Sequence, residues 1–173
     1  GSLVKCSAGG SGGGGASGRD EKIGVLAREI AEQAPELMDL RSVLEKHPIM
    51  YEESMNTVLS QEVVRFNKLI KVVRESLDGV QNALVGLVVM SADLEMMANS
   101  LFLNQVPKIW EEKAYPSLKP LAAWFQDLLE RVNFIHKWIE HDKPPAYWIS
   151  GFYFPQAFLT GTLQNYARKY KIP

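Results

Sequence analysis

SMNTVLSQEVVRFNKLIKVVRESL, residues 54–77, shows the clearest periodicity in this protein. Its apolar residues recur at steps of three and four, the spacing that places side chains on one face of an α-helix. This face carries Met55, Val58, Leu59, Val63, Phe66, Leu69, Ile70, Val73 and Leu77, with Glu62 close to it. The pattern predicts a long amphipathic helix that begins at Ser54 and ends or bends at Asp78 and Gly79.

The segments on either side of this helix show the same periodicity, interrupted by prolines. Proline and the residue before it disfavour helix, so these interruptions separate shorter predicted helices. The expected helices cover residues 20–34, 35–46, 92–104, 117–141 and 155–171, with Asp20, Ser91 and Ser117 as N-caps. Residues 80–90 are apolar almost all round, which predicts a buried helix; a strand is the alternative, because several of them are β-branched. The chain is therefore expected to be all-α, folded as an irregular multi-helix bundle.

Residues 1–19 differ in composition from the rest of the sequence. They include the low-complexity run GGSGGGGASG at 9–18, which has almost no side-chain surface to bury. Gly-rich sequence of this kind behaves as a flexible linker, and Gly1 and Ser2 look like an expression scar. We predict two regions: a flexible Gly/Ser-rich arm over 1–19 and a helical domain over 20–173.

The composition excludes several classes of protein. With 19 Lys and Arg against 20 Asp and Glu, the chain lacks the basic surface expected of a nucleic-acid-binding domain. Its longest apolar run is far shorter than the roughly 20 residues that span a bilayer. Cys6 is the single cysteine, so no intrachain disulfide can form, and a reducing cytoplasmic setting fits. We expect neither nucleic acid nor membrane among the partners.

The sequence contains no familiar catalytic motif. The phosphate-binding pattern GxxxxGKS/T is missing, as are GxGxxG, HExxH and GxSxG. His136 and His141 are five residues apart on one predicted helix, so they point about 140° apart and are poorly placed to chelate a metal. Glu62 lies three residues before Arg65, which favours a structural ion pair over an acid–base pair. The chain is expected to be no enzyme, with no catalytic residues, cofactor or metal.

Aromatic residues are concentrated near the end of the sequence, in AYWISGFYFPQAFLTGTLQNYARKY at 146–170. Each large ring buries on the order of 150–250 Å² when it packs, so this segment needs a partner surface. Because the sequence stops at Pro173, the segment suggests a cut end whose burial partner is partly missing. The aromatic residues singled out to meet this partner are Trp148, Phe152, Tyr153, Phe154 and Phe158.

Four long strings resemble the C-terminal region of dynein heavy chains, and the axonemal branch is the more similar one. The strings are YEESMNTVLSQEVVRFNKL at 51–69, GLVVMSADLE at 86–95, VPKIWEEKAYPSLKPLAAWFQDLLER at 106–131 and YWISGFYFPQAFLTGTLQNYARKYKIP at 147–173. They occur in the family's order, and the resemblance covers about residues 20–173. The Gly-rich arm departs from the family pattern.

The resemblance implies a non-catalytic part of a large motor, a structural and regulatory module that braces the ring of AAA+ modules. The chain would be the helical part of the C-terminal domain, ending before the β-rich part, while the parent motor would be a microtubule-dependent ATPase. Its partners would be the AAA+ modules and the β-rich part of its own heavy chain, with microtubules reached only through the motor. The aromatic residues from Trp148 to Phe158 would be the intramolecular docking surface, or would hold the β-rich part. The setting would be the cytoskeleton, in the axoneme of cilia or flagella, where the motor supports ATP-driven movement. The alternative is an adaptor module that binds a dynein light or intermediate chain or another axonemal component.

Overall fold

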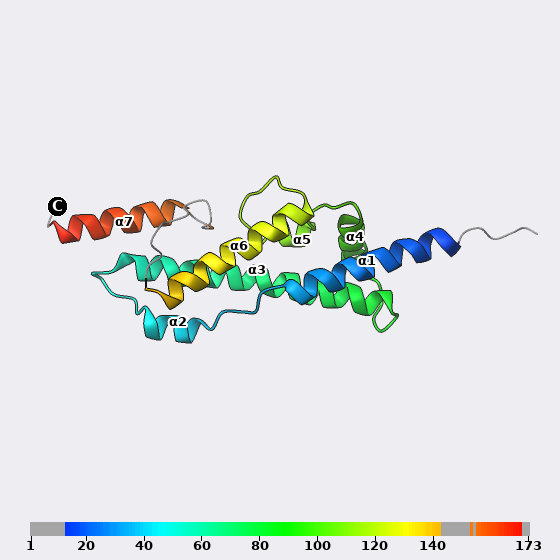
Figure 1. Cartoon of the computed structure of the whole chain (residues 1–173), viewed down its shortest axis with the longest axis horizontal. Helices are drawn as coiled ribbons and strands as arrows, with labels where there is room; N and C mark the ends of the chain where they lie inside the picture. Colours follow the sequence, from blue (N-terminus) through cyan, green and yellow to red (C-terminus); the bar gives the residue numbers. More distant parts are fainter. Residues whose placement is uncertain (1–12, 143–152, 154, 171–173) are drawn as a thin grey trace, which may run out of the picture.

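A computed structural model describes residues 13–142, 153 and 155–170 of the protein (Figure 1). Within these residues the chain forms helices and no strand, which confirms the all-α prediction. The helices are α1 (Gly13–Gln33), α2 (Leu40–Lys46), α3 (Ser54–Leu84), α4 (Ala92–Phe102), α5 (Lys108–Glu111), α6 (Leu121–Glu140) and α7 (Pro155–Lys169). The division into a flexible arm and a helical domain stays a prediction, since residues 1–12 lie outside the described part.

Helix α3 is the centre of the molecule and packs against α1, α2, α4, α5, α6 and α7. It runs along much of the elongated molecule, with α1 beside one end and α7 beside the other (Figure 1). Every apolar residue of the face predicted from Met55 to Leu77 is at most 5% exposed. The helix begins at Ser54, as predicted, and continues past Asp78 and Gly79 to Leu84.

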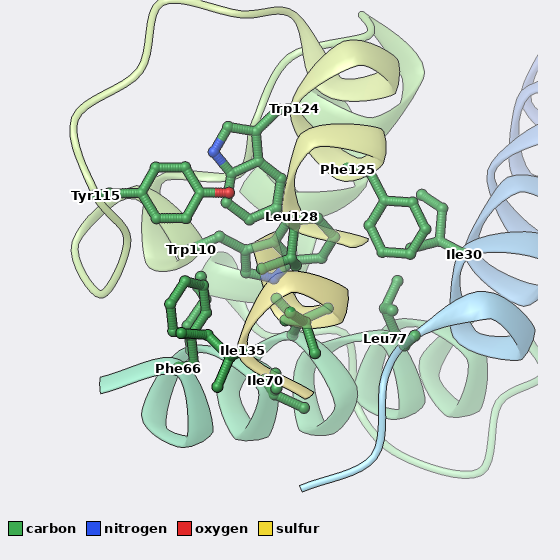
Figure 2. Close-up of a cluster of buried hydrophobic side chains, with 14 of the residues drawn as sticks. Ile30, Phe66, Ile70, Leu77, Trp110, Tyr115, Trp124, Phe125, Leu128 and Ile135 are labelled. Atoms are coloured by element: carbon green, nitrogen blue, oxygen red, sulfur yellow. The ribbon is translucent and has the colours of Figure 1, made fainter. Parts of the chain in front are cut away.

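Large aromatic side chains fill the space where α5 and α6 lie over α3. Trp110 of α5 and Trp124 of α6 are almost fully buried, and their rings stack with centroids 5.6 Å apart. A buried indole N–H needs a hydrogen-bond partner, and Trp110 Nε1 donates to Ser76 Oγ of α3 at 2.8 Å. Figure 2 shows this cluster, in which Phe66 and Ile70 of α3 lie below the two tryptophans. The core of the molecule is therefore built on the middle of α3.

The predicted buried helix over residues 80–90 is confirmed only for residues 80–84, which are the last turn of α3 and include the buried Val80. From Val85 on it is wrong, and the alternative strand does not form. Helix α3 ends at Leu84, and Gly86 then adopts a positive φ of 80°. The Leu87 N–H donates to the carbonyl of Asn82 at 2.9 Å, which closes a Schellman turn. Glycine takes this conformation without the steric cost of a side chain, so the helix ends although the apolar run continues. The exposed apolar side chains beyond the helix are Val85, Leu87, Val88 and Val89.

Two helices near the N-terminus begin at a residue other than the expected one. Helix α1 begins at Gly13, so Asp20 lies inside the helix and is not its N-cap. Helix α2 begins at Leu40 rather than at residue 35, because the Asp39 side chain accepts the Arg41 N–H at 3.1 Å and supplies the N-cap. The N-cap predicted for α4 is confirmed, since Ser91 Oγ accepts the backbone N–H of the third residue of α4 at 3.3 Å.

Asn104 sets both the end of α4 and the start of α6. It adopts a positive φ of 53°, and the Gln105 N–H that follows donates back to the last turn of α4 at 2.9 Å. The backbone oxygen of Asn104 accepts the Leu121 N–H at 3.1 Å, and its Oδ1 accepts the Ala122 N–H at 3.2 Å. Ser117 is therefore not the N-cap of α6: Pro120 takes that position, and Asn104, just beyond α4, accepts from the first two N–H groups of α6.

Candidate interaction site

The five residues predicted to form a docking surface are only partly described. Trp148, Phe152 and Phe154 lie outside the described residues, and Phe158 lies in α7 with its side chain outside the described part. Tyr153 is described, and it is partly buried against the core. The docking role of the set stays a prediction, and among its residues the contacts of Tyr153 are described.

Tyr153 anchors the start of the α7 segment to the centre of the molecule. Its ring meets Phe66 of α3 edge-on with centroids 4.7 Å apart, and Tyr115 edge-on at 5.2 Å. Its hydroxyl donates to the Lys113 carbonyl at 2.8 Å, just beyond α5. Edge-to-face aromatic pairs contribute about 0.5–1.5 kcal/mol beyond area burial. Two separate segments, α3 and residues 113–115 after α5, therefore hold this one tyrosine.

Glu62 is a fully buried acid that joins α3 to this anchor. Its Oε2 accepts the Tyr153 backbone N–H at 2.7 Å, and its Oε1 lies 3.9 Å from Nη1 of Arg65. The predicted ion pair between Glu62 and Arg65 is confirmed. A buried carboxylate is tolerated when a cation and hydrogen bonds compensate it. The contacts of Glu62 therefore indicate a structural role.

The two tyrosines of this cluster stay protonated at neutral pH. Burial raises the pKa of the Tyr153 phenol above its usual 10, and Tyr115 and the Glu62 carboxylate act in the same direction. Burial also raises the pKa of Tyr115, against the opposing charge of Arg131. The Tyr115 hydroxyl is buried and has no hydrogen-bond partner in the described part of the protein. Both phenols are thus weaker acids than an exposed tyrosine, which suits a packing role.

Arg131 of α6 covers the Tyr115 ring and pairs with a buried acid. Its guanidinium carbon lies 3.7 Å from the ring centroid of Tyr115. Its Nε donates to Asp127 Oδ2 at 2.7 Å, and Lys119 Nζ lies 3.1 Å from the other oxygen of that carboxylate. Asp127 is only 5% exposed, so two cations compensate its buried charge. Figure 2 shows Tyr115 beside Trp124 at this edge of the core.

Polar side chains of α7 cap the N-terminus of α3. Asn165 Oδ1 accepts the Ser54 N–H at 2.9 Å, and Asn165 Nδ2 donates to Glu53 Oε1 at 2.6 Å. The Ser54 hydroxyl donates to Gln164 Oε1 at 3.0 Å and accepts from Arg168 Nη1 at 2.5 Å. The first N–H groups of a helix have no partner within it. Here the N-cap Glu53 accepts the Met55 N–H at 3.2 Å, and α7 supplies the partner of the Ser54 N–H. We call these contacts the α7 clasp.

The two faces of α7 differ in their surroundings. On the inner face, a Cβ at Gly161 would lie 3.1 Å from Val58 Cγ2, so glycine permits a close approach to α3. On the outer face, Leu163 and Tyr166, together with Tyr170 directly after the helix, are more than half exposed. They are three and four residues apart, the spacing of one helical stripe. This exposed stripe, which we call the α7 outer stripe, is an apolar surface open to a partner.

The polar groups of the described part form structural contacts. Within residues 13–142, 153 and 155–170, no three His, Cys, Asp or Glu side chains are grouped as a metal site requires. None of the helices in the same part has the length and hydropathy that crossing a bilayer requires. His136 and His141 are exposed on α6 and at its end, apart from the aromatic cluster. The contacts described above are therefore packing and capping contacts between helices.

Comparison with known proteins identifies the family. The family model for the C-terminal domain of the dynein heavy chain matches residues 2–173. The protein belongs to this family. The matched region includes the Gly-rich residues 9–18, which were expected to depart from the family pattern.

Individual relatives of this dynein C-terminal domain are axonemal heavy chains. Dynein axonemal heavy chain 1 of Rattus norvegicus is 56% identical over 158 residues, which are 91% of the sequence. Dynein axonemal heavy chain 3 of Homo sapiens is 52% identical over 94% of the sequence. Dynein axonemal heavy chain 12 of Mus musculus is 46% identical over 92% of it. The dynein C-terminal domain described here spans only 4–5% of the length of these relatives.

Three residues that organise this dynein C-terminal domain were not identified from the sequence. They are Asn104, Asn165 and His47, whose buried ring has Nε2 3.0 Å from the carbonyl oxygen of Ile139 at the end of α6. An asparagine just after a helical run is a C-cap signal and could have identified Asn104. No local signal marks the other two, because their partners are 92 and 111 residues away in the sequence.

Proposed function

We propose that this protein is a structural and regulatory module of an axonemal dynein heavy chain, without catalytic activity or a cofactor of its own. The observation that carries the proposal is its 46–56% identity to three axonemal heavy chains over more than nine tenths of its length. The setting would be the axoneme of cilia or flagella. The module would brace the AAA+ ring of its own heavy chain and support ATP-driven, microtubule-based movement.

The geometry supports a bracing role. Helix α3 connects all other described helices, so a load applied at α7 would reach α1 through one continuous element. The buried acids Glu62 and Asp127 each pair with an arginine of their own helix, which favours a rigid scaffold. The α7 outer stripe offers Leu163, Tyr166 and Tyr170 to another part of the heavy chain, the AAA+ modules or the β-rich part.

A nucleotide-binding assay tests the non-catalytic part of this proposal. The purified protein should hydrolyse no ATP, and its melting temperature should be the same with and without Mg-ATP. Binding to the folded state alone raises stability by RT ln(1 + [L]/Kd), so even a weak nucleotide site would be visible. A reproducible upward shift with ATP would overturn the proposal.

Reconstitution tests the partner. We expect the protein to bind, in trans, a dynein heavy-chain motor fragment that lacks its own C-terminal domain. Leu163→Ser combined with Tyr166→Ser should weaken this binding at least tenfold, whereas the control Leu118→Ser, at an exposed loop residue away from α7, should not. Binding to purified light or intermediate chains in place of the motor fragment would favour the adaptor function instead.

A further inference from the structure

The loop after α3 presents an unusual amount of apolar surface. Leu87 is 74% exposed and Val89 is 89% exposed, and Val85 and Val88 beside them are also exposed. The Schellman turn at Gly86 holds these side chains outside the core. A contiguous apolar surface on a folded domain marks an interaction site more often than scattered single residues do.

This loop adjoins a groove between α1 and the end of α3. The groove has a volume of about 660 Å³, and its apolar lining includes Val25, Leu84 and Val85. Gly24 and Leu84 both line the groove, and a Cβ at Gly24 would lie 3.7 Å from Leu84 Cδ1. A side chain at position 24 would therefore fill part of the groove. Groove and loop form one surface, here named the loop surface: Val25, Leu84, Val85, Leu87, Val88 and Val89.

The charges around the loop surface are mostly negative. No ionisable residue occurs between Asp78 and Asp93, so the surface itself is uncharged. Asp78 lies two turns before the end of α3, and Asp93 and Glu95 lie in the first turn of α4. The charged residues that line the groove are Asp20, Glu21 and Arg28, and Asp20 also pairs with Arg19 at 3.7 Å. An apolar centre with a charged rim is the usual anatomy of a protein interface, and this rim favours a cationic partner.

We propose that the loop surface binds an amphipathic segment that carries Lys or Arg beside apolar side chains, located elsewhere in the same dynein heavy chain. The proposal rests on the proposed function, because the protein spans only 4–5% of its relatives and the rest of such a heavy chain would be its nearest neighbour. An amphipathic helix laid in a groove uses apolar anchors on one face and leaves its charges at the rim. The acidic rim would select the register and speed association.

A peptide array tests the proposal directly. The fluorescently labelled protein is applied to overlapping 20-residue peptides that cover the sequence of a dynein axonemal heavy chain. We expect it to retain peptides that are amphipathic and rich in Lys or Arg, with binding that weakens at high salt. The variants Leu87→Ser and Val89→Ser should reduce this binding at least tenfold, and Leu118→Ser should leave it unchanged. All three sites are exposed, so folding should be preserved, which far-UV circular dichroism checks.

Several outcomes would overturn the proposal. Retention of acidic peptides, or equal binding by Val89→Ser and Leu118→Ser, would exclude the loop surface as a site for a basic partner. A dimer that Val89→Ser abolishes in sedimentation would make a second copy the occupant. The reconstitution assay with the motor fragment separates the two proposals: if Val89→Ser still binds it fully, only the loop surface fails, and if the unmodified protein does not bind it, the proposed function fails as well.

Discussion

Two neighbouring tyrosines bury their rings in one cluster but differ in their hydroxyl groups. Tyr153 donates to the Lys113 carbonyl, whereas Tyr115 has no partner among the described residues. An unpaired buried polar group costs roughly 1–3 kcal/mol, so Tyr115→Phe should raise the free energy of unfolding by about 1 kcal/mol. Tyr153→Phe loses a hydrogen bond and should lower it by about 1 kcal/mol. Urea denaturation followed by tryptophan fluorescence measures the free energy of unfolding of both variants. Changes of the same sign would contradict the difference between the two hydroxyl groups.

The raised pKa of Tyr115 also predicts an alkaline loss of stability. In the unfolded state this phenol ionises near its ordinary pKa of 10, while burial keeps it protonated in the folded state. Stability should therefore fall as the pH rises above about 10, by about 1.4 kcal/mol per pH unit for each such tyrosine. Tyr115→Phe should lose less stability between pH 10 and 11 than the unmodified protein. Tyr51→Phe, at an exposed tyrosine, is the control that should behave like the unmodified protein.

At the scale of helices, Asn104 connects the end of α4 to the start of α6. Asn104→Ala would lose the cap of α6 and place alanine at a positive φ of 53°. Loss of a cap costs about 0.5–2 kcal/mol and the left-handed conformation about 1–2 kcal/mol, so we expect about 2 kcal/mol less stability. Asn104→Gly keeps the backbone conformation and should lose about half of that. If the two variants lose equal stability in thermal unfolding, the positive φ of residue 104 contributes nothing to the cost of Asn104→Ala.

The α7 clasp predicts that a single asparagine controls the docking of a whole helix. Asn165→Ala removes the bond to the Ser54 N–H and the bond to Glu53. Leaving the Ser54 N–H without its partner costs roughly 1–3 kcal/mol, so α7 should detach more often while the core stays folded. Hydrogen exchange should then be faster in α7 and in the first turn of α3 than in α6. Asn133→Ala, at an exposed position of α6, is the matched control and should leave both rates unchanged.

For the whole molecule, the central position of α3 predicts cooperative unfolding. Leu69 is fully buried where α3 carries the core. Leu69→Ala should cost about 2–5 kcal/mol and shift the transitions seen by circular dichroism and by tryptophan fluorescence equally. Leu118→Ala, at an exposed residue, should shift neither by more than about 0.5 kcal/mol. Two separate transitions in the Leu69 variant would mean that the helices around α3 fold as independent units.

Most helices follow from signals close together in the sequence. The apolar spacing over 54–77 and the cap at Ser91 agree with the structure because each involves residues within a few turns of one another. The helix predicted over 80–90 failed beyond Leu84 because the apolar run extends past the end of the helix. The turn at Gly86 exposes apolar side chains that the pattern placed in the core. At the candidate site, the aromatic density singled out Tyr153, but nothing local indicated that Asn165 caps α3.

From sequence alone one can derive the all-α class, the position of α3 and the resemblance to dynein heavy chains. Only the tertiary structure shows that Glu62 accepts the Tyr153 N–H, that Asn165 caps α3 and that the loop after α3 is exposed. Helix formation depends on neighbours a few residues apart, which the sequence displays directly. A hydrogen bond between residues 91 or 111 positions apart depends on how whole helices pack, and no spacing in the sequence encodes that.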